Sequence, residues 1–355
     1  MSQPTPRYPM RFIPGYASST PGIQIATGLK PDATDEEIQF VRQLGIEWVL
    51  VGDPGEHTPE RYRAIQGRLA AHGLQVYSIL NLHDGHNMEE VTLNLPGRER
   101  KIAAFLSYLR ALGAVGIQYT RYAHMGNGIW STEREAIRGG AMSRAFRLDQ
   151  AREGHWMGKT WQAPLTHGRQ YTEDELWDNY AYFIRQAAPV AEEADVYIGM
   201  HPDDPPVPVL GGVPRPIFGN FEGYRRALEI ADSDHVGLCL CVGCWLEGGA
   251  WMGKTILEAI AHFGAQRRIF DVHFRNVTAP IPAGGFVETY MDAGYMDMHR
   301  VVQAFRAVGY DGVLWSDHLP QMVGGYWAAE AYAVGYLKAL VQAANNEAAD
   351  AAGRA

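Results

Sequence analysis

The sequence predicts an α/β fold with a single eight-stranded (β/α)8 barrel, the TIM-barrel architecture. Short apolar runs with β-branched or aromatic residues alternate with longer amphipathic stretches, which is typical of a parallel sheet covered by helices. We count eight such cycles along the 355 residues, and α/β barrels exceed about 250 residues as single domains. No linker-like change of composition divides the chain, so we predict one domain over residues 1–355.

The eight predicted strands are short and mostly apolar, as barrel strands buried on both faces should be. They cover residues 22–26, 46–51, 74–80, 116–121, 196–200, 236–241, 269–274 and 312–316. Amphipathic helices are predicted between them. Thr34 and Glu37 have the spacing of a capping box, in which each side chain binds the other residue's exposed amide. Thr172 and Glu175 repeat this helix-start pattern.

Two internal segments and the C-terminal end break this alternation. About fifty residues, 122–171, follow the fourth strand and are rich in Gly, Arg, His and Trp. Loops of this length in a compact domain are usually lids or binding loops, so we predict a lid-like insertion. The proline-rich segment 203–216 follows the fifth strand. The Ala-rich end, residues 343–355, is expected to be a frayed tail.

The composition excludes several classes of partner. Lys and Arg number 31 against 40 Asp and Glu, a net charge of −9 at pH 7, and no basic cluster is present, so we predict no nucleic-acid partner. No apolar run approaches the ~18 residues that span a bilayer, so we predict no membrane partner. Residues 1–10 lack the apolar core of a secretory signal, and three cysteines within six residues make no disulfide framework. We therefore expect a cytoplasmic protein that binds a small molecule.

Candidate metal ligands stand at the carboxyl ends of the last four predicted strands, where barrel enzymes form their active sites. The four residues are His201, Cys241, His273 and Asp317. Two imidazoles, a thiolate and a carboxylate suit a divalent first-row metal, which leaves manganese, zinc, cobalt and nickel open. Because side chains alternate along a strand, Cys239 shares the face of Cys241 one layer deeper, and Cys244 is expected in the following loop. A structural zinc site made by the three thiolates is the alternative, although no second cysteine pair is present.

At these positions the sequence resembles the mannonate dehydratase family, a branch of the TIM barrels related in shape to xylose isomerase. The matching segments are MHPDDPP at 200–206, LCVGC at 240–244, VHFRN at 272–276, MDM at 296–298 and SDH at 316–318, with weaker similarity over 94–117. The resemblance implies a hydro-lyase that converts D-mannonate to 2-keto-3-deoxy-D-gluconate. It also implies that the four ligands bind a divalent metal, typically manganese, and that His318 and Tyr326 transfer protons. The chain departs from the family at GYMDM, residues 294–298, and in its short loop after His318.

Other polar residues near the predicted barrel mouth are candidates for substrate binding. Arg275 can hold a substrate carboxylate through two parallel hydrogen bonds. Asp203 and Asn276 can bind substrate or orient the ligands. Arg121 and His124 lie at or after the end of the fourth strand and are expected to line a sugar pocket.

The reaction that the resemblance implies is metal-assisted dehydration of a sugar acid. It removes a proton next to the carboxylate and expels a β-hydroxide, and a histidine with a near-neutral pKa suits the proton transfer. One alternative is a metal-dependent sugar isomerase or epimerase on the same barrel. A non-catalytic protein that binds a metal or a sugar acid is the second alternative. We also expect a homo-oligomer.

Overall fold

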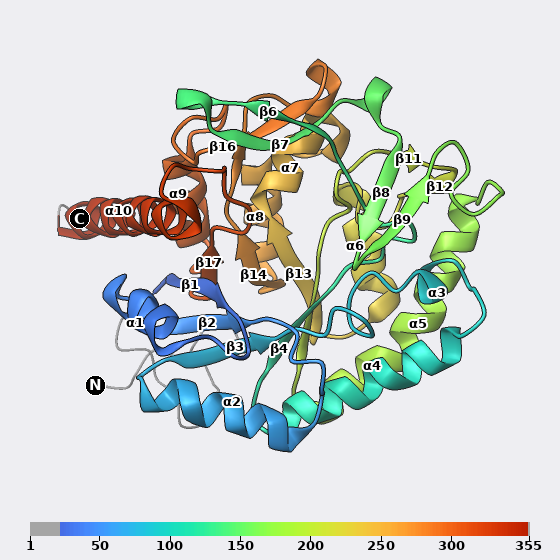
Figure 1. The fold of residues 1–355 in the computed structure, drawn as a ribbon, viewed down its shortest axis with the longest axis horizontal. Coiled ribbons are helices and arrows are strands. Elements are labelled where there is room, and N and C mark those ends of the chain that lie inside the picture. Colours follow the sequence, from blue (N-terminus) through green and yellow to red (C-terminus); the bar gives the residue numbers. More distant parts are fainter. Residues whose placement is uncertain (1–21, 354–355) are drawn as a thin grey trace.

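Eight parallel strands form the centre of the structure, a computed structural model that describes residues 22–353 (Figure 1). In chain order they are β1 (Gln24–Leu29), β2 (Trp48–Val51), β3 (Gln75–Ile79), β4 (Tyr119–Tyr122), β10 (Tyr197–Met200), β13 (Val236–Cys241), β14 (Ile269–His273) and β17 (Val313–Trp315). Their order in the sheet is β3-β2-β1-β17-β14-β13-β10-β4. The two end strands, β3 and β4, also contact each other, so the ring is nearly closed. The predicted TIM barrel is confirmed, and each predicted strand overlaps one of these eight.

Helices alternate with the strands and cover the outside of the barrel (Figure 1). The long ones are α1 (Asp35–Gln43), α2 (Pro59–Ala71), α4 (Arg98–Gly113), α5 (Glu173–Ala194), α6 (Phe221–Ala231), α8 (Ile256–Ala265), α9 (Met298–Ala307) and α10 (Gly325–Gly353). Two short helices, α3 (Glu89–Thr92) and α7 (Val242–Gly248), follow the strands β3 and β13 in the chain. Both predicted capping boxes are present, at Thr34 with Glu37 and at Thr172 with Glu175. None of the described helices is long and apolar enough to cross a membrane.

The helices hold the barrel through apolar faces that the sequence pattern predicted. Ile38 and Val41 of α1 and Val301, Val302 and Phe305 of α9 are almost fully buried. Each such side chain contributes about 1.5–3 kcal/mol when it is removed from water. The Ala-rich end that we expected to fray continues α10 as regular helix to Gly353, since alanine has the highest helix propensity. Residues 1–10, where no secretory signal was found, and residues 354–355 lie outside the described range.

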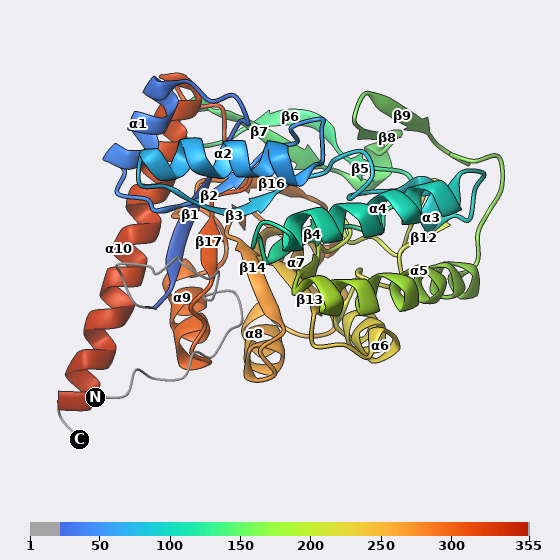
Figure 2. The same cartoon turned by 90° about the horizontal axis from the view of Figure 1, so that it is seen from below.

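The insertion after β4 is folded rather than an irregular loop. Its strands are β5 (Ile129–Trp130), β6 (Thr132–Ala136), β7 (Met142–Phe146), β8 (Glu153–Trp156) and β9 (Lys159–Gln162). β6 and β7 join β15 (Asn276–Val277) and β16 (Phe286–Thr289), which follow β14, in one antiparallel sheet, and β5, β8 and β9 form another. Figure 2 shows these strands along the same side of the barrel. The proline-rich segment contains a further small hairpin, β11 (Val209–Leu210) with β12 (Val213–Pro214).

The β8–β9 hairpin shows why sequence periodicity missed these strands. Trp156 pairs with Lys159 across a two-residue turn in which Met157 and Gly158 have φ values of 47° and 80°. Two positive φ values in succession define the tight turn whose twist matches paired strands. Glycine adopts this conformation readily, but methionine rarely does. The turn therefore carries no sequence signal as clear as Asn-Gly.

Candidate metal and substrate site

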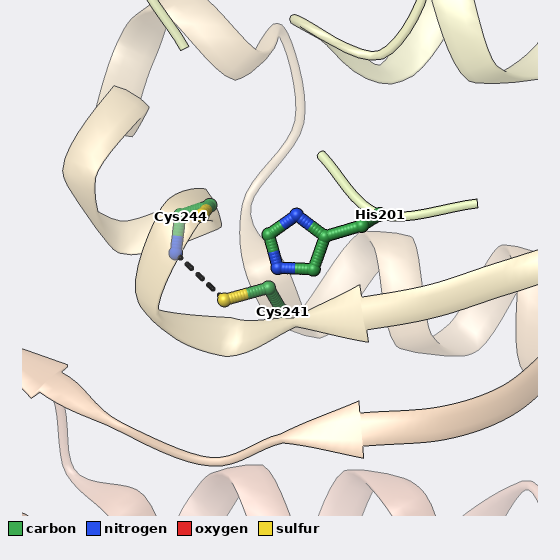
Figure 3. A group of neighbouring side chains, drawn as sticks. All are labelled: His201, Cys241 and Cys244. Carbon is green, nitrogen blue, oxygen red and sulfur yellow. Dashed lines mark hydrogen bonds between the residues drawn. The ribbon is translucent and has the colours of Figure 1, made fainter. Parts of the chain in front are cut away.

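The four predicted metal ligands converge at the carboxyl ends of β10, β13, β14 and β17. Nε2 of His201 lies 3.2 Å from Nδ1 of His273, and the same Nδ1 lies 3.4 Å from Oδ2 of Asp317. Cys241, His273 and Asp317 bring one donor atom each within 4.8 Å of one another. His201, Cys241 and Cys244 form a second group of this kind, and their side chains point toward one another in Figure 3. The barrel thus brings together donor atoms from four separate strands.

Local contacts fix the direction of two of these donors. Nδ1 of His201 lies 2.7 Å from the carbonyl oxygen of Pro202, which can only accept, so Nδ1 donates a hydrogen and Nε2 keeps its lone pair. Such a contact to the second nitrogen is how proteins orient metal-binding histidines. Cys241 is the N-cap of α7, and its sulfur accepts a hydrogen bond of 3.3 Å from the backbone N–H of Cys244 (Figure 3). Cys244 therefore lies in this short helix and not in the loop that we expected.

The electrostatic surroundings favour the ionised forms of Asp317 and Cys241. Burial raises the pKa of Asp317, but the charges of His273, His318 and Arg275 outweigh it and hold that pKa well below its usual range. Burial likewise opposes ionisation of Cys241, whereas a hydrogen bond with Cys244 and the charge of Arg275 bring its pKa well below the usual value. Burial lowers the pKa of His273, but the charges of Asp317 and Cys239 raise it well above its usual value. Metal ligands must be deprotonated, so a cation bound here would displace the His273 proton, and a thiolate, a carboxylate and two imidazoles suit a divalent first-row cation.

Asp317 has a strained backbone that its side-chain contacts hold in place. Its φ of 57° lies in the left-handed region, which costs a non-glycine residue on the order of 1–3 kcal/mol. NH1 of Arg275 donates a hydrogen bond to Oδ2 of Asp317. The observed strain at this position is consistent with a functional requirement for where the carboxylate points.

A cavity of about 140 Å³ opens beside the ligands. Strand ends provide most of its wall, and Ile129 of β5 and Trp156 of β8 cover it from the insertion. The full lining consists of Leu80, Asn81, Leu82, His86, Arg121, Met125, Ile129, Trp156, His201, Asp204, His273, Asp317 and His318. The insertion therefore takes part in enclosing the site.

Two of the residues predicted for substrate handling line this cavity. The guanidinium of Arg121 contacts Nε2 of His273 and lies 4.8 Å from the centre of the Trp315 ring. His318 places Nδ1 at 2.7 Å from Oε1 of Glu288. Burial lowers the pKa of His318, but the charges of Asp317 and Glu288 have a larger, opposite effect, so the pKa is raised overall.

Arg275 lies behind the ligands instead of on the cavity. Its side chain is 2% exposed, and NH2 lies 2.7 Å from Glu247 and 3.5 Å from Asp204. Its Nε lies 3.4 Å from Glu288, and NH1 binds Asp317, one of the four candidate ligands. Because protein carboxylates already occupy the guanidinium, it orients Asp317 and is not free for the substrate carboxylate that we expected it to bind.

Asn276 and Asp203 also lie away from the cavity. The Asn276 side-chain amide donates to the backbone carbonyls of Met291 and Met296 at 3.0 and 2.8 Å, so it holds the loop between β16 and α9 in shape. Asp203 faces Arg215 at 3.8 Å, and burial raises its pKa to about 6. Its neighbour Asp204 lines the cavity in its place.

His124 belongs to the aromatic core. Its Nδ1 lies 2.6 Å from the Tyr122 hydroxyl, and its ring packs edge-on against Tyr180. Burial lowers the pKa of His124 to about 3. A polar residue two positions beyond a strand end can turn outward as well as inward, and here it turns away from the sugar pocket that we expected it to line.

Tyr326 lines a second, larger cavity of about 800 Å³. It lies in the first turn of α10 and is 54% exposed. This cavity lies at the ends of β1, β2 and β3, and it shares Leu80, Leu82 and Arg121 with the smaller one. The proposed proton-transfer tyrosine is therefore beside the ligand cavity and not part of its lining.

Several site residues carry no signal that sequence reasoning could use. His86 lines the cavity, its ring centre lies 4.9 Å from that of Trp156, and burial together with His201 and Arg121 puts its pKa well below the usual value. Buried charged residues surround the site behind the ligands, and these are Arg144, Asp204, Glu247 and Glu288. Asp204 lies within the HPDDPP segment and could have been weighed beside Asp203, but the others come from segments far apart in the sequence.

Comparison with known proteins identifies the family. A family model described as D-mannonate dehydratase (UxuA) matches residues 151–350, more than half of the chain. The mannonate dehydratase of Streptococcus suis strain 05ZYH33 is 31% identical over 314 residues, which are 82% of this chain and 83% of that protein. The chain belongs to the mannonate dehydratase family. It is therefore an enzyme of the hydro-lyase class, as the resemblance in its motifs implied.

Further matches to mannonate dehydratases extend over most of the chain. The Thermotoga neapolitana enzyme is 30% identical over 271 residues, covering 69% of this chain and 72% of its own. The crystal structure of mannonate dehydratase from Streptococcus suis serotype 2 superposes with a TM-score of 0.79 at 24% identity, over 93% of this chain and 95% of that one. A xylose isomerase domain protein from Planctomyces limnophilus has a TM-score of 0.60 at 14% identity, over 92% of this chain and 99% of that one. These structural likenesses show the shared TIM-barrel fold.

Proposed function

We propose that this family member dehydrates D-mannonate to 2-keto-3-deoxy-D-gluconate and water, with Mn²⁺ held by four side chains. The ligands are His201, Cys241, His273 and Asp317. The proposal is supported by the donor atoms of Cys241, His273 and Asp317, which lie within 4.8 Å of one another beside a cavity in a hydro-lyase of this family. Nε2 of His201 adds a fourth donor 3.2 Å from Nδ1 of His273. When bound there, a divalent cation supplies Lewis-acid stabilisation of the negative charge that develops on substrate oxygens.

The protein's own residues would bind and orient the sugar acid. Arg121 is the cation on the cavity wall, so it can attract the substrate carboxylate, whereas Arg275 is committed to Asp317. Ile129 and Trp156 cover the cavity and exclude water, which strengthens every charge interaction inside it. A substrate held in this way loses little further freedom on the way to the transition state.

His318 is the residue that we assign to proton transfer. It lines the cavity, and its Nδ1 is engaged by Glu288, so Nε2 is the nitrogen left to exchange a proton with the substrate. A histidine that gives a proton to the departing hydroxide converts it to water, a far better leaving group.

A panel of aldonates incubated with the purified protein tests the proposal. We expect a 2-keto-3-deoxy acid from D-mannonate in the presence of Mn²⁺, no product after treatment with a chelator, and recovery when Mn²⁺ is returned. Absence of any 2-keto-3-deoxy acid from the whole panel with Mn²⁺ would overturn it. Incubation with free ketoses, followed by analysis of C2 and C3 epimers, tests the isomerase or epimerase alternative in the same preparation.

A further inference from the structure

Glu288 contacts the proton-transfer histidine from a part of the chain that no motif includes. It lies in β16, is 4% exposed, and its Oε1 is 2.7 Å from Nδ1 of His318. An ionised carboxylate can only accept a hydrogen bond, so Nδ1 of His318 carries the hydrogen. The other ring nitrogen, Nε2, lies 3.8 Å from Oδ1 of the ligand Asp317. The contact with Glu288 thus decides which edge of the imidazole faces the cavity.

Two arginines keep Glu288 ionised. NH1 of Arg144 lies 2.9 Å from Oε1 of Glu288, and Nε of Arg275 lies 3.4 Å from the same oxygen. Burial raises the pKa of Glu288, but the charges of His318, Arg275 and Arg144 outweigh it and hold the pKa at about 2. A charged acceptor makes a stronger hydrogen bond to the imidazole N–H than a neutral one.

The insertion supplies this arrangement through strand register. β16 pairs antiparallel with β7 of the insertion, with Phe286 opposite Phe146 and Val287 opposite Ala145. Continued by one residue, this register brings Glu288 opposite Arg144, and NH1 of Arg144 donates a hydrogen bond to Oε1 of Glu288. Directly opposed residues of unlike charge form a stabilising cross-strand pair. The sheet built from the insertion therefore presents an ion pair to the histidine at the end of β17.

We propose that Glu288 is a positioning residue for the dehydration, which holds Nδ1–H of His318 so that Nε2 faces the substrate, and that Arg144 of the insertion holds Glu288 in place. The inference rests on the proposed role of His318 in proton transfer. It gives the insertion a second task besides covering the cavity, because without β7 the carboxylate behind the histidine would lose its closest arginine.

A double-mutant cycle separates this role from a general structural one. E288Q keeps the shape of the side chain and removes its charge, and we expect kcat to fall about 10- to 100-fold, the usual effect of removing a group that orients a site residue. H318Q should lower kcat by about 10²- to 10⁴-fold. The double variant E288Q/H318Q should be no slower than H318Q alone, because Glu288 acts only through the histidine. Equal losses from E288Q in both backgrounds would overturn the proposal.

Glu247 offers a matched control for damage to the charge network. It is also buried and lies 2.7 Å from Arg275 and 3.6 Å from Arg144, but it makes no hydrogen bond to His318 within residues 22–353. Whatever E247Q costs, we expect that loss to be independent of H318Q and to multiply with it. E135Q, which removes the Glu135–Arg147 pair of the same sheet, should leave kcat unchanged. If E288Q lowers kcat by the same factor in the wild-type and H318Q backgrounds, as we expect of E247Q, then Glu288 acts only as a member of the buried charge network and not through His318.

Nuclear magnetic resonance of the imidazole nitrogens tests the contact without using activity. We expect the Nδ1 proton of His318 to be protected from exchange with water in the wild-type protein. E288D, which keeps the charge but shortens the side chain, should expose that proton, and it also serves if E288Q does not fold. An unprotected proton in the wild-type protein would overturn the inference. Failure of the wild-type protein to dehydrate any aldonate would contradict the proposed function, and the protected proton would still report whether Glu288 holds the histidine.

Discussion

The two halves of the barrel mouth carry different chemistry. The ends of β10, β13, β14 and β17 hold buried ionisable groups that contact one another around a cavity of about 140 Å³. The ends of β1, β2 and β3 border a cavity of about 800 Å³ whose wall is largely apolar and includes Phe40, Trp315 and Trp327. Arg121 lines both cavities. The difference indicates that reactive groups are gathered in one half, while the other half offers shape and apolar surface.

Loss of a ligand should have the largest effect. Cys241→Ala removes the thiolate from the first half of this comparison, and we expect kcat to fall at least about 100-fold together with the loss of bound Mn²⁺, since even changes behind metal ligands cost about 10- to 100-fold. Metal content by elemental analysis and kcat for the aldonate provide the measurements. Cys239→Ala, two residues earlier on β13, removes a thiol that also lies within 4.8 Å of donor atoms of His201 and His273, and this variant should keep the metal. A Cys241→Ala protein with wild-type metal content would contradict the assignment of the metal ligands to the ends of β10, β13, β14 and β17.

Removal of the Arg275 guanidinium, which lies behind the four candidate ligands, should mainly reduce the free energy of unfolding. Arg275→Met leaves Asp317, Glu247 and Glu288 without their shared partner, and breaking a buried charge network in this way costs about 3–5 kcal/mol in the free energy of unfolding. Urea denaturation measures this change. The exposed Arg225, which pairs with Glu222 and Glu229 on α6, is the control, and Arg225→Met should shift the midpoint little. Equal shifts of the denaturation midpoint for Arg275→Met and Arg225→Met would show that the buried charge network stabilises the fold no more than an exposed ion pair does.

Tyr326 gives a smaller expected effect because it lies in the other half of the mouth. Tyr326→Phe removes a hydroxyl from a side chain that is 54% exposed and lines the larger cavity. We expect kcat to fall by less than about 10-fold, well below the loss of about 10²-fold or more expected for a general acid or base. Steady-state kinetics with the same aldonate give the comparison. A loss as large as that of His318→Gln would mean that the reacting groups extend into the apolar half.

The smallest effect is expected at a contact outside both cavities, where the insertion is attached to α3. Glu89 of α3 accepts hydrogen bonds from Lys159 and from Trp161, the latter at 2.8 Å, and lies 3.3 Å from His167. Burial raises the pKa of Glu89, but these partners lower it to about 2. Its stabilising contribution is therefore fully present above the unfolded pKa of about 4.3 and is lost as the pH falls toward 2.

Glu89→Gln should reduce the free energy of unfolding by about 1 kcal/mol at neutral pH, an amount limited by solvent screening. The difference from the wild-type protein should shrink between about pH 4.3 and 2, as measured by urea denaturation at a series of pH values. If the two proteins differ in free energy of unfolding by the same amount at pH 7 and near pH 2, the charge of Glu89 does not hold the insertion to α3.

The barrel and the meeting of the four candidate ligands at its mouth could be predicted because both follow from local patterns. The apolar run that ends at Cys241, for example, identifies a strand, and the barrel rule places strand ends together, so four short segments suffice to predict a shared site. Arg275 shows the limit of this reasoning. Its type suits a substrate carboxylate, but its partners Glu247 and Glu288 come from a short helix and an added strand whose positions depend on tertiary packing.

The same limit applies to side-chain direction. His124 and Asn276 follow strand ends just as His201 does, yet one packs against Tyr180 and the other holds a loop. A sequence shows that a polar residue lies near the mouth, but the irregular backbone after the strand decides where it points. Glu288 was missed for a related reason, because its pairing with Arg144 depends on antiparallel register between two insertions separated by more than one hundred residues.

Anomalous diffraction at the manganese edge, from crystals grown with Mn²⁺, tests the central claim most directly. The account predicts one strong peak in the smaller cavity, bonded to Nε2 of His201, Sγ of Cys241, Nδ1 of His273 and a carboxylate oxygen of Asp317. No peak at these four side chains, or a peak held instead by Asp204, Cys244 and Glu247, would contradict it.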